Sequence, residues 1–190
     1  MTAARSTAPV SVDAYLAGEL TATRKHEYVA GAVYAMAGAK NAHNVISGNL
    51  FGVLHASLAG KACQPFNSDT KVRIQLPTHT RFYYPDGMVV CDENPLEDSF
   101  QDRPVVVAEV LSESTRRTDQ GEKLDAYLTI PSLSVCLLVE QEQPAVVAMR
   151  RTDQGFIRQV FSGLDQTVPL PEVEAALPLA QLYARVPMDA

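Results

Sequence analysis

The sequence predicts an α/β (α+β) fold in which a mixed β-sheet is flanked by helices. Short apolar segments typical of strands follow one another with few helices between them, and residues 41–58 carry apolar side chains at helical spacing. The composition, 46% hydrophobic and 20% charged over 190 residues, is that of an ordinary globular chain. We therefore expect a flexible tail over residues 1–10 and a single domain over residues 11–190.

The first predicted elements are a short helix at residues 12–20, a hairpin and a long helix. Ser11 suits the N-cap of the short helix, and Ala30-Gly31 suits the turn between hairpin strands 25–29 and 33–36. Asn41 is the predicted N-cap of the long helix, and Gly60 its stop. Its core-facing stripe is predicted to comprise Ala42, Val45, Ile46, Asn49, Val53, Leu54 and Ser57, with Leu50 and Leu58 on the flank.

The rest of the chain is predicted to consist mainly of strands. A second helix is expected at residues 120–128, ended by Pro131, and a last short helix at residues 179–183. Residues 92–103 form a polar, acidic loop. The predicted strands are residues 63–66, 70–76, 82–84, 87–91, 104–111, 134–140, 145–150 and 156–161.

Charge, cysteines and hydropathy restrict the functional classes. The apolar runs are too short to span a bilayer, and the first ten residues lack the apolar core of a signal peptide, so we expect no membrane partner and a cytoplasmic location. Cys63, Cys91 and Cys136 are widely spaced and odd in number, which argues against a disulfide framework and a cysteine zinc site. Because the net charge is -6, any DNA contact must come from a local patch, a dimer groove or a bound cation.

Two acidic residues occupy unusual positions. Glu109 lies inside a strand that is apolar on both faces, where a carboxylate must be paired, protonated or bound to a cation. Asp86 immediately precedes another apolar strand. Two carboxylates on neighbouring strands are suitable oxygen ligands for Mg²⁺. Alternatively, Glu109 pairs with a buried Arg or Lys, and Asp86 belongs to a Pro-Asp-Gly turn.

Several sequence blocks resemble, in order, the Uma2 family of restriction-endonuclease-like proteins, a branch of the PD-(D/E)XK nuclease superfamily. The resemblance extends from about Tyr15 to about Val147, and agreement of several blocks is more specific than any single motif. The matching blocks are residues 24–38, 43–44, 68–73, 84–90, 107–115 and 119–127.

The resemblance implies a restriction-endonuclease-like mixed sheet flanked by helices and metal-dependent hydrolysis of phosphodiester bonds. It gives Asp86 and Glu109 the roles of the two metal-binding acids of the motif. The motif lysine normally stands two residues after the second acid, where this chain has Leu111, so Lys123 in the following helix is the candidate. Glu27 resembles an additional acid that related nucleases carry early in the chain.

Other polar residues are weaker candidates. Asp69, Lys71 and Arg73 alternate along one strand and are interpreted as a solvated sheet face, although Lys71 could also be a second lysine near the scissile phosphate. His43 stands at the start of the long helix, where a neutral or solvated histidine is common; because a matching block contains it, a general base is the weaker alternative. The basic pair Arg116-Arg117 could contact phosphate but is more simply a solvated pair.

The favoured interpretation is an endonuclease-like hydrolase that uses Mg²⁺, or alternatively Mn²⁺, to cleave DNA. Its expected catalytic residues are Asp86, Glu109, Lys123 and Glu27, with the first two as metal ligands. A homodimer is consistent with double-strand cleavage, which needs two sites. The alternatives are a non-cleaving module on the same fold that binds nucleic acid or a partner, and a structural domain in which Glu109 is neutralised internally.

Overall fold

The computed structural model describes residues 8–113 and 115–187, so most of the tail expected at residues 1–10 lies outside the described residues. The helices are α1 (Val12–Glu19), α2 (Asn41–Leu58), α3 (Arg116–Thr118), α4 (Leu124–Tyr127) and α5 (Leu179–Leu182), with a π-helical turn η1 (Asp119–Lys123) and a 3-10 turn η2 (Pro171–Val173). The strands are β1 (His26–Val29), β2 (Ala32–Ala35), β3 (Gln64–Asn67), β4 (Lys71–Gln75), β5 (Thr80–Tyr83), β6 (Gly87–Val90), β7 (Phe100–Gln101), β8 (Pro104–Leu111), β9 (Val135–Glu140), β10 (Ala145–Thr152), β11 (Gly155–Ser162), β12 (Thr167–Leu170) and β13 (Ala175–Pro178).

The strands form three sheets rather than one. The central six-stranded sheet has the order β11-β10-β9-β8-β6-β3 and is mixed, because β8 and β9 run parallel while the other neighbours are antiparallel. A five-stranded sheet has the order β2-β1-β5-β4-β7, and β12 pairs with β13. The expected mixed sheet flanked by helices is confirmed, whereas β7, β12 and β13 were not predicted.

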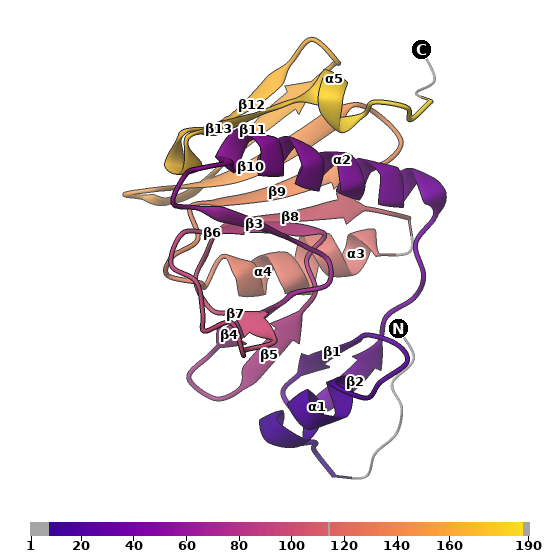
Figure 1. Ribbon diagram of the computed structural model, residues 1–190, viewed down its shortest axis with the longest axis vertical. Coiled ribbons are helices and arrows are strands. Elements are labelled where there is room, and N and C mark those ends of the chain that lie inside the picture. The colour runs from indigo at the N-terminus through magenta and orange to yellow at the C-terminus, as the bar shows by residue number, and fades with distance from the viewer. Residues whose placement is uncertain (1–7, 114, 188–190) are drawn as a thin grey trace.

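The sheets and helices stack in layers (Figure 1). Helix α2 and the β12-β13 hairpin cover one face of the central sheet, where they bury a large apolar cluster. The other face of the central sheet packs on α4 and on the five-stranded sheet. Helix α1 packs against the remaining face of the five-stranded sheet through Tyr15, which contacts Tyr28 and Phe82.

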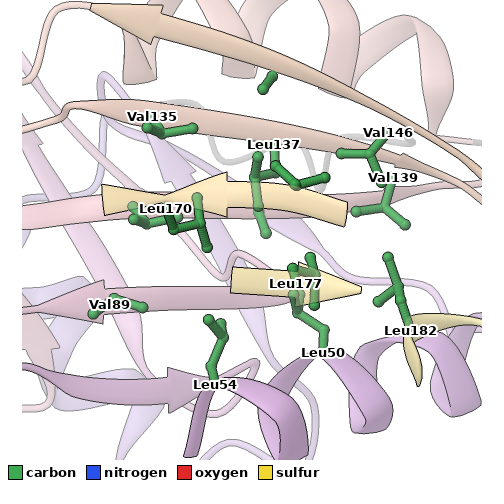
Figure 2. Packing of buried hydrophobic residues seen from close by; sticks show 14 of the residues in the cluster. Leu50, Leu54, Val89, Val135, Leu137, Val139, Val146, Leu170, Leu177 and Leu182 are labelled. Atoms are coloured by element: carbon green, nitrogen blue, oxygen red, sulfur yellow. The ribbon is translucent and has the colours of Figure 1, made fainter. Parts of the chain in front are cut away.

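Helix α2 has the predicted bounds, but the predicted centre of its apolar stripe was wrong. The fully buried residues are spaced four apart, so Leu50 and Leu58 lie in the core rather than on its flank, while Val45 is 36% exposed. Figure 2 shows Leu50 beneath Leu177, and Leu54 directed toward the strand that carries Val89. The predicted N-cap was also one residue off: Lys40 is the N-cap and makes no side-chain capping hydrogen bond.

The sequence argued against a disulfide framework, and this is corrected by the structure, in which Cys63 and Cys91 are bonded to each other. They stand one residue outside the ends of β3 and β6, which pair antiparallel with Gln64 opposite Val90, so continuation of this register places the two cysteines face to face. Sequence spacing could not reveal this pairing, since β3 and β6 are separated by β4 and β5 along the chain. Cys136 is free and buried. Among the described residues, no helix combines the length and apolar character needed to cross a bilayer.

Candidate active site

Strand pairing brings Asp86 beside Glu109. Gly87 of β6 pairs with Ala108 of β8, so Asp86, one residue earlier on an antiparallel neighbour, stands next to Glu109. The Val110 N–H donates to Asp86 Oδ2 at 2.7 Å, which fixes the carboxylate against β8. By strand alternation Glu109 shares with Val107 the face of the central sheet that packs on α4, whereas Asp86 directly precedes β6 and lies at the end of that strand.

Gly87 follows Asp86 because α2 crosses the strand closely there. Gly87 lies within β6, and a Cβ built on it would come within 3.0 Å of Leu50 Cδ2. The glycine of the Pro-Asp-Gly sequence therefore permits helix-sheet packing next to the site, and it has an ordinary strand conformation rather than a positive φ.

Glu109 is 3% exposed and receives two donors on the same oxygen. Tyr127 of α4 donates its hydroxyl to Glu109 Oε1 at 2.6 Å, and Lys123 Nζ lies 3.4 Å from that atom. The structure thus brings Lys123 to the motif acid, as expected for a lysine relocated from position 111 to the following helix. It also fulfils the structural alternative, in which a buried lysine pairs with Glu109.

Lys123 contacts three carboxylates at once. Its Nζ lies 2.7 Å from Glu27 Oε1 and 3.4 Å from Asp119 Oδ1, besides the contact with Glu109. Glu27 comes from β1 of the five-stranded sheet, whereas Asp119 and Lys123 come from the π-helical turn η1. The ammonium group therefore joins the two sheets and the intervening helical segment.

The helix predicted over residues 120–128 is in fact three consecutive pieces. Helix α3 begins at Arg116, the π-helical turn occupies Asp119–Lys123, and α4 ends at Tyr127. The sequence pattern predicted an ordinary α-helix because a single π-helical turn of 5 residues is too short to show an apolar period of its own. Such turns are rare and are frequent at functional sites. This one begins at Asp119 and ends at Lys123, the two residues that form an ion pair across the turn.

The four carboxylates, Glu27, Asp86, Glu109 and Asp119, are each 9% exposed or less and form what we call the acidic cluster. Burial raises the pKa of Glu109 well above its usual value, and nearby Asp119 and Asp86 raise it further, although Lys123 lowers it. Burial likewise raises the pKa values of Glu27 and Asp86. The single ammonium group of Lys123 therefore compensates only part of the buried negative charge.

Lys123 remains an ammonium ion in this setting. Burial alone lowers the pKa of Lys123, but Glu109, Glu27 and Asp119 outweigh burial and leave that pKa well above its usual value. Lys123 is thus suited to electrostatic stabilisation of negative charge and unsuited to accepting a proton.

Helix α2 supplies two contacts to Asp86 that the sequence did not predict. His43 Nε2 lies 2.9 Å from Asp86 Oδ1, and Ser47 Oγ donates to the Asp86 carbonyl at 3.2 Å. Asp119 was also missed as a member of the site. Its spacing of four from Lys123 is the local signal that could have found it, since such pairs share a helix face.

The solvated face predicted for Asp69, Lys71 and Arg73 was wrong for the two basic residues. Lys71 is 4% exposed and donates to the Tyr84 hydroxyl at 3.2 Å, while burial lowers the pKa of Lys71. Arg73 makes a bidentate pair with Asp102 at 2.7 and 2.6 Å. Asp69 is exposed as expected. The ring of Phe100 on β7 covers Arg73, and that strand was not foreseen.

The basic pair Arg116-Arg117 is not uniformly solvated. Arg116 makes a bidentate pair with Glu140, whose side chain is 13% exposed, while Arg117 is exposed. Because the guanidinium group of Arg116 already pairs with Glu140, Arg117 is the better placed of the two to contact a phosphate.

The acidic cluster fits a hard divalent cation by its donor chemistry. Its oxygens are carboxylates, and Glu27 Oε1 is buried without a hydrogen bond of good geometry although it lies 2.7 Å from Lys123 Nζ. Within residues 8–113 and 115–187, no three His, Cys, Asp or Glu side chains stand ready around one ion. Mg²⁺ does not require three protein ligands, because it is usually held by one or two carboxylates together with waters and a phosphate.

The chain is similar to a known protein family, to two curated proteins and to a solved structure. The model of the Uma2 family, described as "Putative restriction endonuclease", matches residues 12–181. Two uncharacterized proteins of Synechocystis sp. are each 35% identical: sll1609 over 67% of this chain and 72% of its own length, and slr1290 over 77% and 76%. A crystal structure from Anabaena variabilis, described as a putative nuclease belonging to DUF820, covers 89% of this chain and 97% of its own with a TM-score of 0.70 and 18% identity. That structural likeness supports the fold.

Proposed function

Because the chain belongs to the Uma2 family of restriction-endonuclease-like proteins, we propose that it is a Mg²⁺-dependent endonuclease that cleaves DNA phosphodiester bonds. Mn²⁺ is the expected substitute ion. The observation that carries the proposal is the acidic cluster, in which three buried carboxylates contact one ammonium group and a fourth, Asp86, is buried close by. Burying several carboxylates is costly unless cations neutralise them, and a divalent ion would supply the missing positive charge.

The proposed roles follow from the position of each residue. Asp86 and Glu109 would hold the ion, because Asp86, directly before β6, lies close enough to Glu109 on β8 for its charge to raise the pKa of Glu109. Once bound, such an ion lowers the pKa of a water and stabilises charge on a phosphoryl oxygen. Lys123 would stabilise the charge that develops on the phosphate, since its ammonium group is held beside Glu109. Glu27 would orient Lys123 through their 2.7 Å ion pair.

The nucleic-acid substrate follows from the family, whereas its contacts with this chain are part of the proposal. A net charge of -6 means that binding depends on local basic residues and on the bound cation rather than on an overall positive surface. A homodimer belongs to the proposal as well, since cleavage of both strands needs two sites.

One observation favours the non-cleaving alternative as a second candidate. Both donors to Glu109 come from the chain itself, and the Lys123 ammonium already contacts three carboxylates. In that state the cluster is held together without a metal ion. A protein that kept this state with DNA bound would bind nucleic acid or a partner without hydrolysis.

The proposed function is tested by DNA cleavage with the purified full chain. We expect nicking of supercoiled plasmid with Mg²⁺ or Mn²⁺ and none with a chelator. Asp86→Asn and Glu109→Gln should each reduce the rate on the order of 10²–10³-fold, because each removes a charge that stabilises the transition state. Glu97→Gln is the matched control, because Glu97 is an exposed acid in the loop after β6. This variant should cleave DNA at the rate of the unaltered chain.

Two results would contradict the proposed cleavage. Unchanged cleavage by Asp86→Asn and Glu109→Gln would assign the activity to another site or to a contaminant. Metal-independent binding of DNA without cleavage by the unaltered chain would favour the non-cleaving alternative.

A further inference from the structure

His43 lies where α2 meets the acidic cluster. It is the third residue of α2, and its Nε2 lies 2.9 Å from Asp86 Oδ1, with 13% of its side chain exposed. This contact spans 43 residues of sequence, so the packing of α2 on the central sheet creates it. His43 is not among the acids and lysine of the proposed centre.

The hydrogen bonding of the imidazole ring is one-sided. Among the described residues, His43 makes its hydrogen bond with Asp86, while its Nδ1 is buried and has no partner. A histidine that serves only the fold usually satisfies both ring nitrogens when buried, because an unsatisfied polar atom costs stability. The ring of His43 is therefore directed to Asp86 at the expense of its second nitrogen.

The carboxylate of Asp86 is held from two directions. His43 binds Oδ1 from the α2 side, and the Val110 N–H donates to Oδ2 from β8. Ser47, one turn after His43 on the same helix face, donates to the Asp86 carbonyl and fixes the backbone. Each carboxylate oxygen has two lone-pair positions, so both oxygens keep one position for a cation.

We propose that His43 is a positioning residue that fixes the Asp86 carboxylate in the orientation needed to bind a divalent cation. The inference rests on the proposed function and adds a residue that the acid-lysine pattern does not contain. Carboxylates that ligate a metal are themselves hydrogen-bonded, and loss of such a partner typically weakens metal affinity about 10–100-fold. Helix α2 thus has a role at the site beyond covering the core.

The test compares substitutions that keep or remove a donor at the Nε2 position. The side-chain amide of glutamine reaches about as far as Nε2, whereas that of asparagine reaches only about as far as Nδ1, and phenylalanine keeps the ring without any donor. Mn²⁺ binding to the full chain, without DNA, is measured by titration calorimetry at fixed pH, and folding is checked by thermal unfolding. His43→Asn and His43→Phe should weaken Mn²⁺ binding about 10–100-fold, and His43→Gln should bind Mn²⁺ like the unaltered chain.

The possible results separate this inference from the proposed function. Normal Mn²⁺ binding by His43→Asn and His43→Phe would overturn the role of His43 alone, provided that Asp86→Asn abolishes binding. Weakened Mn²⁺ binding by a folded His43→Gln would also overturn it, and so would unfolding of both His43→Asn and His43→Phe, because the ring would then serve the fold. Absence of Mn²⁺ binding to the unaltered chain would overturn the proposed function together with this inference.

Discussion

Lys123 shows how one side chain can organise several others at the residue scale. Its ammonium group has three N–H donors, and three carboxylates, those of Glu27, Glu109 and Asp119, lie 2.7–3.4 Å from Nζ. Removal of one partner from a buried ion pair usually costs about 3–5 kcal/mol, because the other charge is left uncompensated. The acidic cluster therefore depends on Lys123 for stability, whatever its role in hydrolysis.

The raised pKa values of the buried carboxylates predict a pH-dependent stability. Between the unfolded pKa of a glutamate, near 4.5, and the higher pKa of folded Glu109, the folded chain binds more protons than the unfolded chain. The free energy of unfolding should therefore fall as the pH rises above about 4.5, and Glu27 and Asp86 contribute in the same direction. Urea unfolding at a series of pH values would measure this decline.

The control for the pH dependence is Glu109→Gln, which removes one of the three carboxylates with raised pKa values. Its decline in stability above pH 4.5 should be shallower than that of the unaltered chain, whereas the exposed Glu97→Gln should show the full decline. Equal slopes in the unaltered chain and in Glu109→Gln would contradict this prediction, because they would show that the pKa of Glu109 is not raised in the folded chain.

Helix α2 connects the core with the candidate site at the element scale. Its buried residues Ile46, Leu50, Leu54 and Leu58 face the central sheet, while His43 and Ser47 near its start contact Asp86. The close contact of Leu50 with Gly87 joins these two roles, because Gly87 directly follows Asp86. Packing of α2 thus sets the position of its first turn relative to the site.

Substitution of Leu50 should be far more damaging than substitution of Val45, although both are apolar residues of α2. Leu50 is fully buried, so Leu50→Ala should lower the free energy of unfolding by about 2–5 kcal/mol through lost burial and a cavity. Val45 is 36% exposed, and Val45→Ala should cost less than about 1 kcal/mol. Urea unfolding of the two variants checks this order, and similar losses would mean that α2 is rotated from its described orientation.

The layered architecture determines, at the scale of the whole molecule, which segments can meet. Glu27, Asp86, Glu109 and Lys123 come from β1, from the start of β6, from β8 and from η1, and they converge where the two larger sheets face each other across the α4 layer. The Cys63–Cys91 bond adds a covalent link between β3, at the edge of the central sheet, and the end of β6.

Because of the Cys63–Cys91 disulfide, we expect the free energy of unfolding to be lower under reducing conditions than under oxidising conditions. Cross-linking residues 28 apart restricts the unfolded chain, and the chain-entropy model gives about 3.5 kcal/mol for a loop of this length. A thiol reductant should therefore lower the urea midpoint of the unaltered chain. The double variant Cys63→Ala/Cys91→Ala should unfold at the lower midpoint with or without reductant, and an unaltered chain insensitive to reductant would show that the bond is not formed in solution.

The sequence by itself determined the elements and the chemistry of the site. Periodicity predicted α2 and most strands to within a few residues, because helix and strand place side chains with fixed local periods. A carboxylate inside the apolar β8 segment indicated Glu109, and the resemblance to a family indicated Asp86, Lys123 and Glu27. All four lie together in the structure.

Only the tertiary structure decided what depends on contacts between distant segments. The contact of His43 with Asp86 and the Cys63–Cys91 bond each join residues that are tens of positions apart. Lys71 is buried by other elements of the fold. No local period in the sequence encodes these features. The π-helical turn is local, but its hydrogen-bond pattern leaves no signature in side-chain spacing. The division of the strands into three sheets likewise follows from pairing across the chain.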